Sequence, residues 1–105
     1  MKSFHLLLAL GLTTAVAGQA AASEAVVKKA RCIACHAVDK KMIGPAYKDV
    51  AAKYRGQAEA VTMLSAKVRN GGSGVWGEIP MPPHAADKLS DADLKSAVEW
   101  VLSRE

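Results

Sequence analysis

The chain has little of what marks a membrane-spanning, nucleic-acid-binding, disulfide-stabilised or β-sheet protein. Its apolar run at residues 6–12 is far shorter than the roughly 20 residues that a transmembrane helix needs. The formal net charge is only +4, and no basic stripe interleaved with aromatic residues appears, so nucleic-acid binding is not expected. β-Branched residues never alternate over the length of a strand, which argues against sheets. The two cysteines stand three positions apart, and a disulfide between them would close almost no loop and stabilise little.

Residues 1–22 have the three regions of a secretory signal peptide. Lys2 gives a basic start, a short apolar run follows, and the rest is small and nearly uncharged. We expect cleavage before Ser23 or before Glu24, and no cysteine precedes the cut, which argues against a lipoprotein. A retained amphipathic anchor is the alternative. The prediction is an exported, periplasmic protein with one small domain at residues 23–105 and no stable membrane insertion.

The remaining residues carry the apolar periodicity of short amphipathic helices, so the predicted fold class is all-α. Four helices are expected: three at about residues 24–30, 46–54 and 58–69, and a fourth that follows Ser90 and carries a buried apolar stripe of Leu94, Ala97, Val98, Val101 and Leu102. Pro45 suits the start of the second helix, because its missing N–H is harmless there. Ser90 is a natural N-cap for the fourth helix, and Leu89 and Leu94 are placed to form a hydrophobic staple around it.

The strongest functional signal is the segment Cys32-Ile33-Ala34-Cys35-His36. Two cysteines three apart, with a histidine directly after the second, are the attachment motif of a c-type haem. The cysteines can form thioether bonds to the two vinyl groups of the porphyrin, and His36 is then held beside the iron as an axial ligand. A haem also suits a domain of about 80 residues, because so small a core is marginal without further apolar surface to bury.

A haem held by His36 has a second axial position, for which the sequence offers several candidates or none. They are Met42, Met63, Met81 and His84. Met42 follows His36 too closely to cross easily to the far face of the porphyrin, and Met63 lies off the apolar stripe of its helix. Met81 stands in a long connection where flanking prolines stiffen the backbone and present one side chain at a low entropic cost. Met81 is therefore the predicted second ligand, and His84 is interpreted as a loop histidine.

Two further residues are candidates for supporting the haem. The carbonyl of Pro45 can accept a hydrogen bond from the free ring nitrogen of His36, which would orient that ligand. The indole N–H of Trp76 can donate to a buried propionate, because an indole in an interior needs a partner; simple packing against the haem is the alternative. With His36 and Met81 filling both axial positions, substrates are kept off the iron, and a thioether ligand raises the potential. This pair favours electron transfer over catalysis.

Three other functions fit parts of the same pattern. A thiol oxidoreductase would use Cys32 and Cys35 as a redox pair, but that motif normally follows a strand in a βαβ unit. A zinc site would use both cysteines with His36 and His84, although the adjacent Cys35 and His36 are poorly placed for two tetrahedral corners. A haem enzyme or ligand sensor would need an open or labile sixth position, which a proline-braced Met81 disfavours.

Three stretches together resemble a known family. They are the haem motif, residues 41–51 with the sequence KMIGPAYKDVA, and residues 74–83 with the sequence GVWGEIPMPP. The pattern closely resembles the short class I bacterial cytochromes c of the cytochrome c-551 type, over essentially the whole of residues 23–105. The resemblance implies a small cytochrome c fold of about four helices around one covalent haem c with its iron. It implies these site residues: Cys32 and Cys35 as thioether sites, His36 and Met81 as iron ligands, Pro45 bonded to His36, and Trp76 bonded to a propionate.

Members of that family are periplasmic electron shuttles rather than enzymes. The resemblance implies that this chain carries electrons from the cytochrome bc1 level to a terminal reductase such as nitrite reductase, or to a terminal oxidase. Redox proteins with acidic docking surfaces are the expected partners, because residues 24–60 carry eight Lys or Arg against four acidic residues. The chain itself is expected to be a monomer. His84 departs from the family, which often has an asparagine there whose amide can bond the methionine sulfur.

Overall fold

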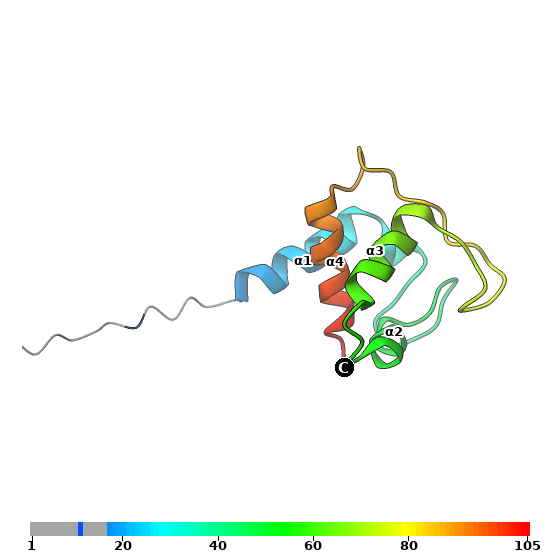
Figure 1. The fold of residues 1–105 in the computed structure, drawn as a ribbon, viewed down its shortest axis with the longest axis horizontal. Coiled ribbons are helices and arrows are strands. Elements are labelled where there is room, and N and C mark those ends of the chain that lie inside the picture. Colours follow the sequence, from blue (N-terminus) through cyan, green and yellow to red (C-terminus); the bar gives the residue numbers. More distant parts are fainter. Residues whose placement is uncertain (1–10, 12–16) are drawn as a thin grey trace, which may run out of the picture.

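The computed structural model describes residue 11 and residues 17–105 of the chain. In this part the elements follow the order α1 (Ala17–Lys29), a 3₁₀ turn η1 (Cys32–Ala34), α2 (Tyr47–Tyr54), α3 (Ala60–Asn70) and α4 (Asp91–Leu102) (Figure 1). The described residues contain no strand, so the all-α prediction is confirmed. Most of the predicted signal peptide, residues 1–10 and 12–16, lies outside them. None of the described helices has both the length and the apolar character needed to cross a bilayer.

Helix α4 is the common element against which α1, α2 and α3 all pack. In one apolar cluster, Val27 of α1 packs against Tyr47 and Trp100. In two others, residues of α2 and α3 pack against the remaining apolar residues of α4. The stripe expected on α4 is confirmed, since all its members lie in these clusters: Leu94, Ala97, Val98, Val101 and Leu102.

The start of α4 is the best-specified helix boundary. Ser90 has an extended backbone, and its hydroxyl accepts a hydrogen bond from the Asp93 N–H at 3.2 Å, as expected of an N-cap. Leu89 and Leu94 are both buried and belong to one cluster, so the predicted staple is also present.

The start of α2 differs from the prediction. Its N-cap is Ala46, so Pro45 lies before the helix rather than at its first position. Alanine has no side-chain acceptor, and the first two helical N–H groups are instead satisfied by main-chain carbonyls. The Tyr47 N–H donates to Ala37 and the Lys48 N–H donates to Val38, at 2.9 and 3.1 Å. The start of α2 is thereby joined to the segment that follows the cysteine motif.

The other two helices are also shifted from their predicted bounds. Helix α1 begins at Ala17, seven residues before the expected start at Glu24, and α3 begins at Ala60, two residues later than expected. Helix α3 ends at Asn70, and Gly71 after it has φ 70° and ψ −165°, a conformation other than the left-handed αL cap. Glycine adopts this positive φ readily, and the Gly71 N–H donates to the Lys67 carbonyl at 2.7 Å.

The connection from α3 to α4 is closed at its base, although the sequence predicts no regular structure there. Gly72 and Met81 form an isolated antiparallel bridge, with N–H···O distances of 3.0 and 2.9 Å in the two directions. Gly71 allows this close approach: a Cβ on it would lie 2.5 Å from the Met81 carbonyl oxygen and 2.9 Å from the Pro83 nitrogen. The backbone of Met81 is therefore held against the end of α3.

Ser90→Ala tests whether the α4 cap contributes to stability. The substitution removes the acceptor of the Asp93 N–H, and we expect the free energy of unfolding to fall by about 1 kcal/mol. Denaturant titration of the purified protein measures it. Ser96→Ala, inside the same helix, is the matched control and is expected to cause no comparable loss. Equal effects of the two variants would show that the cap contributes nothing.

Candidate functional site

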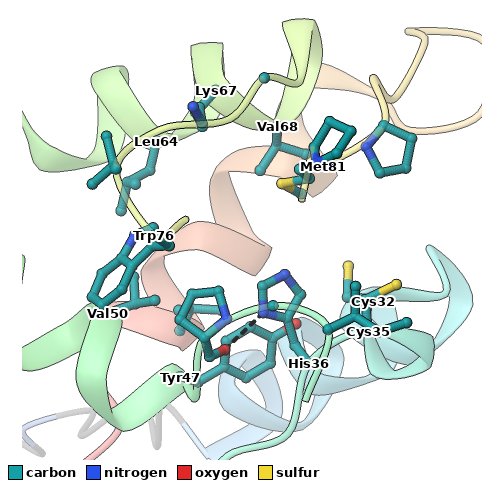
Figure 2. Close-up of a pocket in the computed structure, with 18 of the residues that line it drawn as sticks. Cys32, Cys35, His36, Tyr47, Val50, Leu64, Lys67, Val68, Trp76 and Met81 are labelled. Atoms are coloured by element: carbon teal, nitrogen blue, oxygen red, sulfur yellow. Dashed lines mark hydrogen bonds between the residues drawn. The ribbon is translucent and has the colours of Figure 1, made fainter. Parts of the chain in front are cut away.

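An apolar cleft enclosing about 1160 Å³, its open mouth included, lies between two walls of the molecule. Cys32, Cys35 and His36 line one wall, and Met81 lies on the other, together with α3 (Figure 2). All four α-helices contribute apolar side chains to the lining: Val27, Val50, Leu64, Val68, Leu94, Ala97, Val98 and Val101. Leu64 and Val68 of α3 are only partly buried because they face this cleft.

A sharp turn brings the cysteine motif to the cleft. Arg31 has φ 64°, a left-handed conformation that non-glycine residues adopt rarely, and η1 follows it directly. The His36 N–H donates to the Cys32 carbonyl at 2.9 Å, so the motif folds back on itself. Both cysteines are half-buried, and their sulfur atoms lie at the same edge of the cleft (Figure 2).

The imidazole of His36 is held by three contacts from one short segment. Its Nδ1 lies 2.8 Å from the Pro45 carbonyl oxygen, which can only accept, so Nδ1 carries the proton and Nε2 is left for the cleft. The ring stacks on Tyr47 with centroids 5.0 Å apart and an interplanar angle of 18°. Gly44 covers its other side so closely that a Cβ there would lie 2.7 Å from Nδ1 and 2.8 Å from Nε2.

Met81 lies on the opposite wall, and its sulfur faces the His36 ring across the cleft (Figure 2). The other residues weighed as second ligands, Met42, Met63 and His84, are not among the residues that line this cleft. Met42 and Met63 are each 42 % exposed on the surface. Of the candidates that the sequence offers, the fold therefore brings only Met81 together with His36.

Trp76 lies at one end of the cleft and is 37 % exposed, so its side chain borders both the cleft and the surface (Figure 2). Its hydrogen bond to a propionate stays a prediction. The ammonium group of Lys53, on α2, lies 5.7 Å from the centroid of the Trp76 ring and 5.8 Å from that of Tyr54. This cation–π contact joins α2 to the loop after α3. No local sequence pattern predicts this contact, because Lys53 and Trp76 are far apart in the chain.

Burial governs the electrostatics of the cysteine wall. It raises the pKa of the Cys32 thiol above its ordinary value, although the neighbouring Tyr47 hydroxyl acts in the opposite direction. Burial likewise raises the pKa of Tyr47 well above its usual range, so its hydroxyl stays protonated. A redox-active thiol needs the opposite shift, because the thiolate is the reactive form. The thiol oxidoreductase alternative thus finds no support here.

The zinc alternative also lacks a suitable set of ligands. In residue 11 and residues 17–105, no group of three or more His, Cys, Asp or Glu side chains is placed to hold a metal ion. His84, the fourth ligand of that hypothesis, does not line the cleft with the two cysteines and His36.

The residues present fit a haem. The cleft is lined by apolar side chains, two cysteine sulfurs lie at one edge, and the His36 imidazole faces a thioether across it. Gly44 is the sharpest sign of this fit, because any side chain there would displace the His36 imidazole from its position in the cleft. Sequence reasoning missed the roles of Gly44 and of the Tyr47 ring, although both belong to the Gly-Pro-Ala-Tyr stretch that carries the family resemblance.

Comparisons with known proteins agree with this site. The cytochrome c family model matches residues 20–105. The chain is 49 % identical to cytochrome c-551 of Pseudomonas aeruginosa over 107 aligned residues, covering 100 % of both chains. It is 46 % identical to cytochrome c-552 of Hydrogenobacter thermophilus, covering 98 % of both. The crystal structure of wild-type Nitrosomonas europaea cytochrome c552 superposes with a TM-score of 0.72 at 49 % identity, covering 78 % of this chain and 99 % of that one.

The match extends over the whole described domain, and the cleft has the residues that such a protein needs. The haem-attachment motif, the all-α fold and the relatives all lead to the same assignment. The chain belongs to the cytochrome c family, and it is a single-haem electron-transfer protein with a covalently bound, iron-containing haem c.

Proposed function

We propose that this chain is a periplasmic electron shuttle in which His36 and Met81 are the two axial ligands of the haem iron. Cys32 and Cys35 hold the haem through thioether bonds. The observation that supports this most directly is the position of His36 and Met81 on opposite walls of one apolar cleft, with both cysteine sulfurs at its edge. The haem supplies one reversible electron at its iron.

The chain's own residues set how that electron is held. Pro45 keeps the proton on Nδ1 of His36, so that Nε2 is free to ligate and the ring keeps its orientation. The thioether of Met81 favours the reduced state and so raises the potential. The apolar lining excludes water, and two ligands from the protein leave no position for a substrate. These properties suit repeated electron transfer with little rearrangement.

Trp76 is proposed to donate its indole N–H to a haem propionate at the end of the cleft. It lines the cleft there, and Lys53 beside its ring adds a positive charge near the same place. Lys67 lines the same cleft from α3. A carboxylate that is buried away from water needs hydrogen-bond donors and positive charge nearby, and an indole N–H with neighbouring ammonium groups supplies both.

Partners are proposed to dock at the open mouth of the cleft. Exposed apolar side chains line it, namely Ile43, Val75 and Ile79. Among the lysines of residues 24–60, Lys28 and Lys48 are each paired with an acid, Glu24 at 3.4 Å and Asp39 at 2.6 Å. Lys29, Lys40 and Lys41 are exposed, and the last two lie three and two residues before the mouth residue Ile43. A small apolar contact with a basic edge suits brief binding to acidic redox proteins.

The proposed pathway runs from the cytochrome bc1 level to a terminal reductase such as nitrite reductase, or to a terminal oxidase. This part rests on the resemblance of the chain to the short class I bacterial cytochromes. Export through residues 1–22 would place the mature domain, residues 23–105, in the periplasm, where such partners are reached.

Met81→Ala tests the axial ligation. In the oxidised haem protein we expect loss of the iron–sulfur charge-transfer band, appearance of high-spin features and a lower reduction potential, because the thioether no longer favours the reduced state. Visible spectroscopy and redox titration measure these changes. Met63→Ala, which alters an exposed methionine on α3, is the control and should leave all three unchanged. A high-spin spectrum in the unmutated protein would instead support the alternative, a haem enzyme or ligand sensor with a labile sixth position.

Lys41→Gln tests local steering at the mouth. We expect the second-order oxidation rate with ferricyanide to fall with rising ionic strength, because salt screens attraction between a basic edge and an anion. The second-order rate at which hexaammineruthenium(II), a cation, reduces the oxidised protein should rise under the same conditions. Lys41→Gln should lower the ferricyanide rate more than Lys95→Gln, which makes the same charge change on α4. Equal effects would mean that net charge alone, and no local edge, attracts the probe.

Mass spectrometry of the exported protein tests the signal peptide. We expect a mature chain beginning at Ser23 or Glu24 with one haem added to its mass, because three regions typical of a signal peptide precede these residues. An intact N-terminus on a membrane-associated protein would contradict cleavage and favour the retained anchor.

A further inference from the structure

The side chain of Arg69, in the last turn of α3, binds the segment that leads from Met81 to α4. Its Nη1 donates to the carbonyls of His84 and Leu89 at 3.0 and 2.7 Å, and its Nη2 donates to Asp91 Oδ1 at 2.6 Å. One side chain thus joins α3 to two points of the connection and to the first residue of α4. The Arg69 side chain is 21 % exposed, so these bonds lie partly out of water.

His84 is fixed to α3 through both of its main-chain polar groups. Its N–H donates to the Val68 carbonyl at 3.1 Å, and its carbonyl accepts from Arg69. Because Val68 and Arg69 are neighbours, His84 is fastened to a single point at the end of α3. Only two residues separate His84 from Met81.

Those two residues, Pro82 and Pro83, transmit the constraint. Neither has an N–H, and each has a fixed φ, so this stretch can neither make its own donor bonds nor bend easily. Met81 itself is held on its other side by the bridge to Gly72. The sulfur therefore sits on a short rigid arm that is anchored at Met81 and at His84.

The carbonyl bonds of Arg69 matter more than its ion pair. Asp91 is 96 % exposed, and an ion pair with so exposed a partner contributes little. The bonds to His84 and Leu89 are part-buried and come from a charged donor, which makes them stronger. A guanidinium can reach three acceptors at once, whereas an ammonium group on a flexible stem lacks that fixed fork.

We propose that Arg69 is a positioning residue that holds the Met81 arm, and so keeps the sulfur at the iron in the haem-bound protein. This inference rests on the proposed role of Met81 as an axial ligand. It assigns to Arg69 no contact with the haem. The side chain acts through the main chain of His84 and the two prolines.

The experiment uses the oxidised haem protein and imidazole as a competing ligand for the iron. Imidazole binds when Met81 is displaced, so its apparent affinity rises with the population of the displaced arm. We expect Arg69→Ala to raise this affinity about tenfold or more, the factor that follows from losing hydrogen bonds to a charged donor. Hydrogen exchange at the Met81 and His84 amides should accelerate in the same variant.

Arg104→Ala is the matched control. Arg104 also binds main chain, donating from Nε to the Trp100 carbonyl at 3.1 Å, but it does so at the far end of α4. We expect it to change neither the imidazole affinity nor the two exchange rates. Arg69→Lys keeps the charge without the fork, and it should lie between Arg69→Ala and the unmutated protein. If Arg69→Ala does not bind haem, Arg69→Lys is the variant on which the same measurements are made.

Failure of the role proposed for Arg69 can be distinguished from failure of the ligation by Met81. If Arg69→Ala and Arg104→Ala raise the imidazole affinity equally, general destabilisation explains the effect and the proposal is overturned. The unmutated protein can show an iron–sulfur band while the Met81 and His84 amides exchange at the same rate in Arg69→Ala as in the unmutated protein. In that case the proposal fails while Met81 remains a ligand. Absence of that band from the unmutated protein would instead overturn the ligation by Met81, and with it the role given to Arg69.

Discussion

The hydrogen bond from His36 to the Pro45 carbonyl is the interaction on which the rest of the site depends. A carbonyl can only accept, so this bond determines which ring nitrogen faces the cleft. Gly44 and Tyr47, on either side of Pro45, set the tilt of the same ring from its two faces. One four-residue segment therefore controls the tautomer, rotation and position of the imidazole. The start of α2 holds that segment in place, because its first N–H groups bind the chain just after His36.

The two walls of the cleft come from distant parts of the chain, and the helices that lead into both walls pack on α4. Helix α1 leads into the cysteine motif and packs on α4, while α3 leads into the Met81 segment and packs on α4 as well (Figure 1). The distance between the walls is thus set by helix packing and not by the loops that carry His36 and Met81. This division explains why the apolar stripe of α4 contributes both to the core and to the lining of the cleft.

Local signals in the sequence were sufficient for some parts of the structure and not for others. Helix α4 could be placed closely because Ser90, Leu89 and Leu94 act within a few residues of one another. The sequence predicts the wrong helical position for Pro45, because the first N–H groups of α2 are satisfied by carbonyls about ten residues earlier rather than by a side-chain cap. Arg69 could not have been selected, since its acceptors are 15 to 22 residues away and two of them are main-chain carbonyls, which leave no mark in a sequence.

The bridge between Gly72 and Met81 separates the exposed tip of the loop from the methionine at its base. Residues 73–80 lie beyond it on the exposed side, while the sulfur lies at the base of the loop, held independently by the end of α3. Exposed loop tips tolerate changes in sequence and length far better than anchored backbone does. Substitutions at exposed apolar positions of this tip, such as Val75 and Ile79, can therefore alter the recognition surface while the main-chain anchoring of Met81 is preserved. A closed loop of this kind allows that surface and the anchored methionine to evolve separately on one small scaffold.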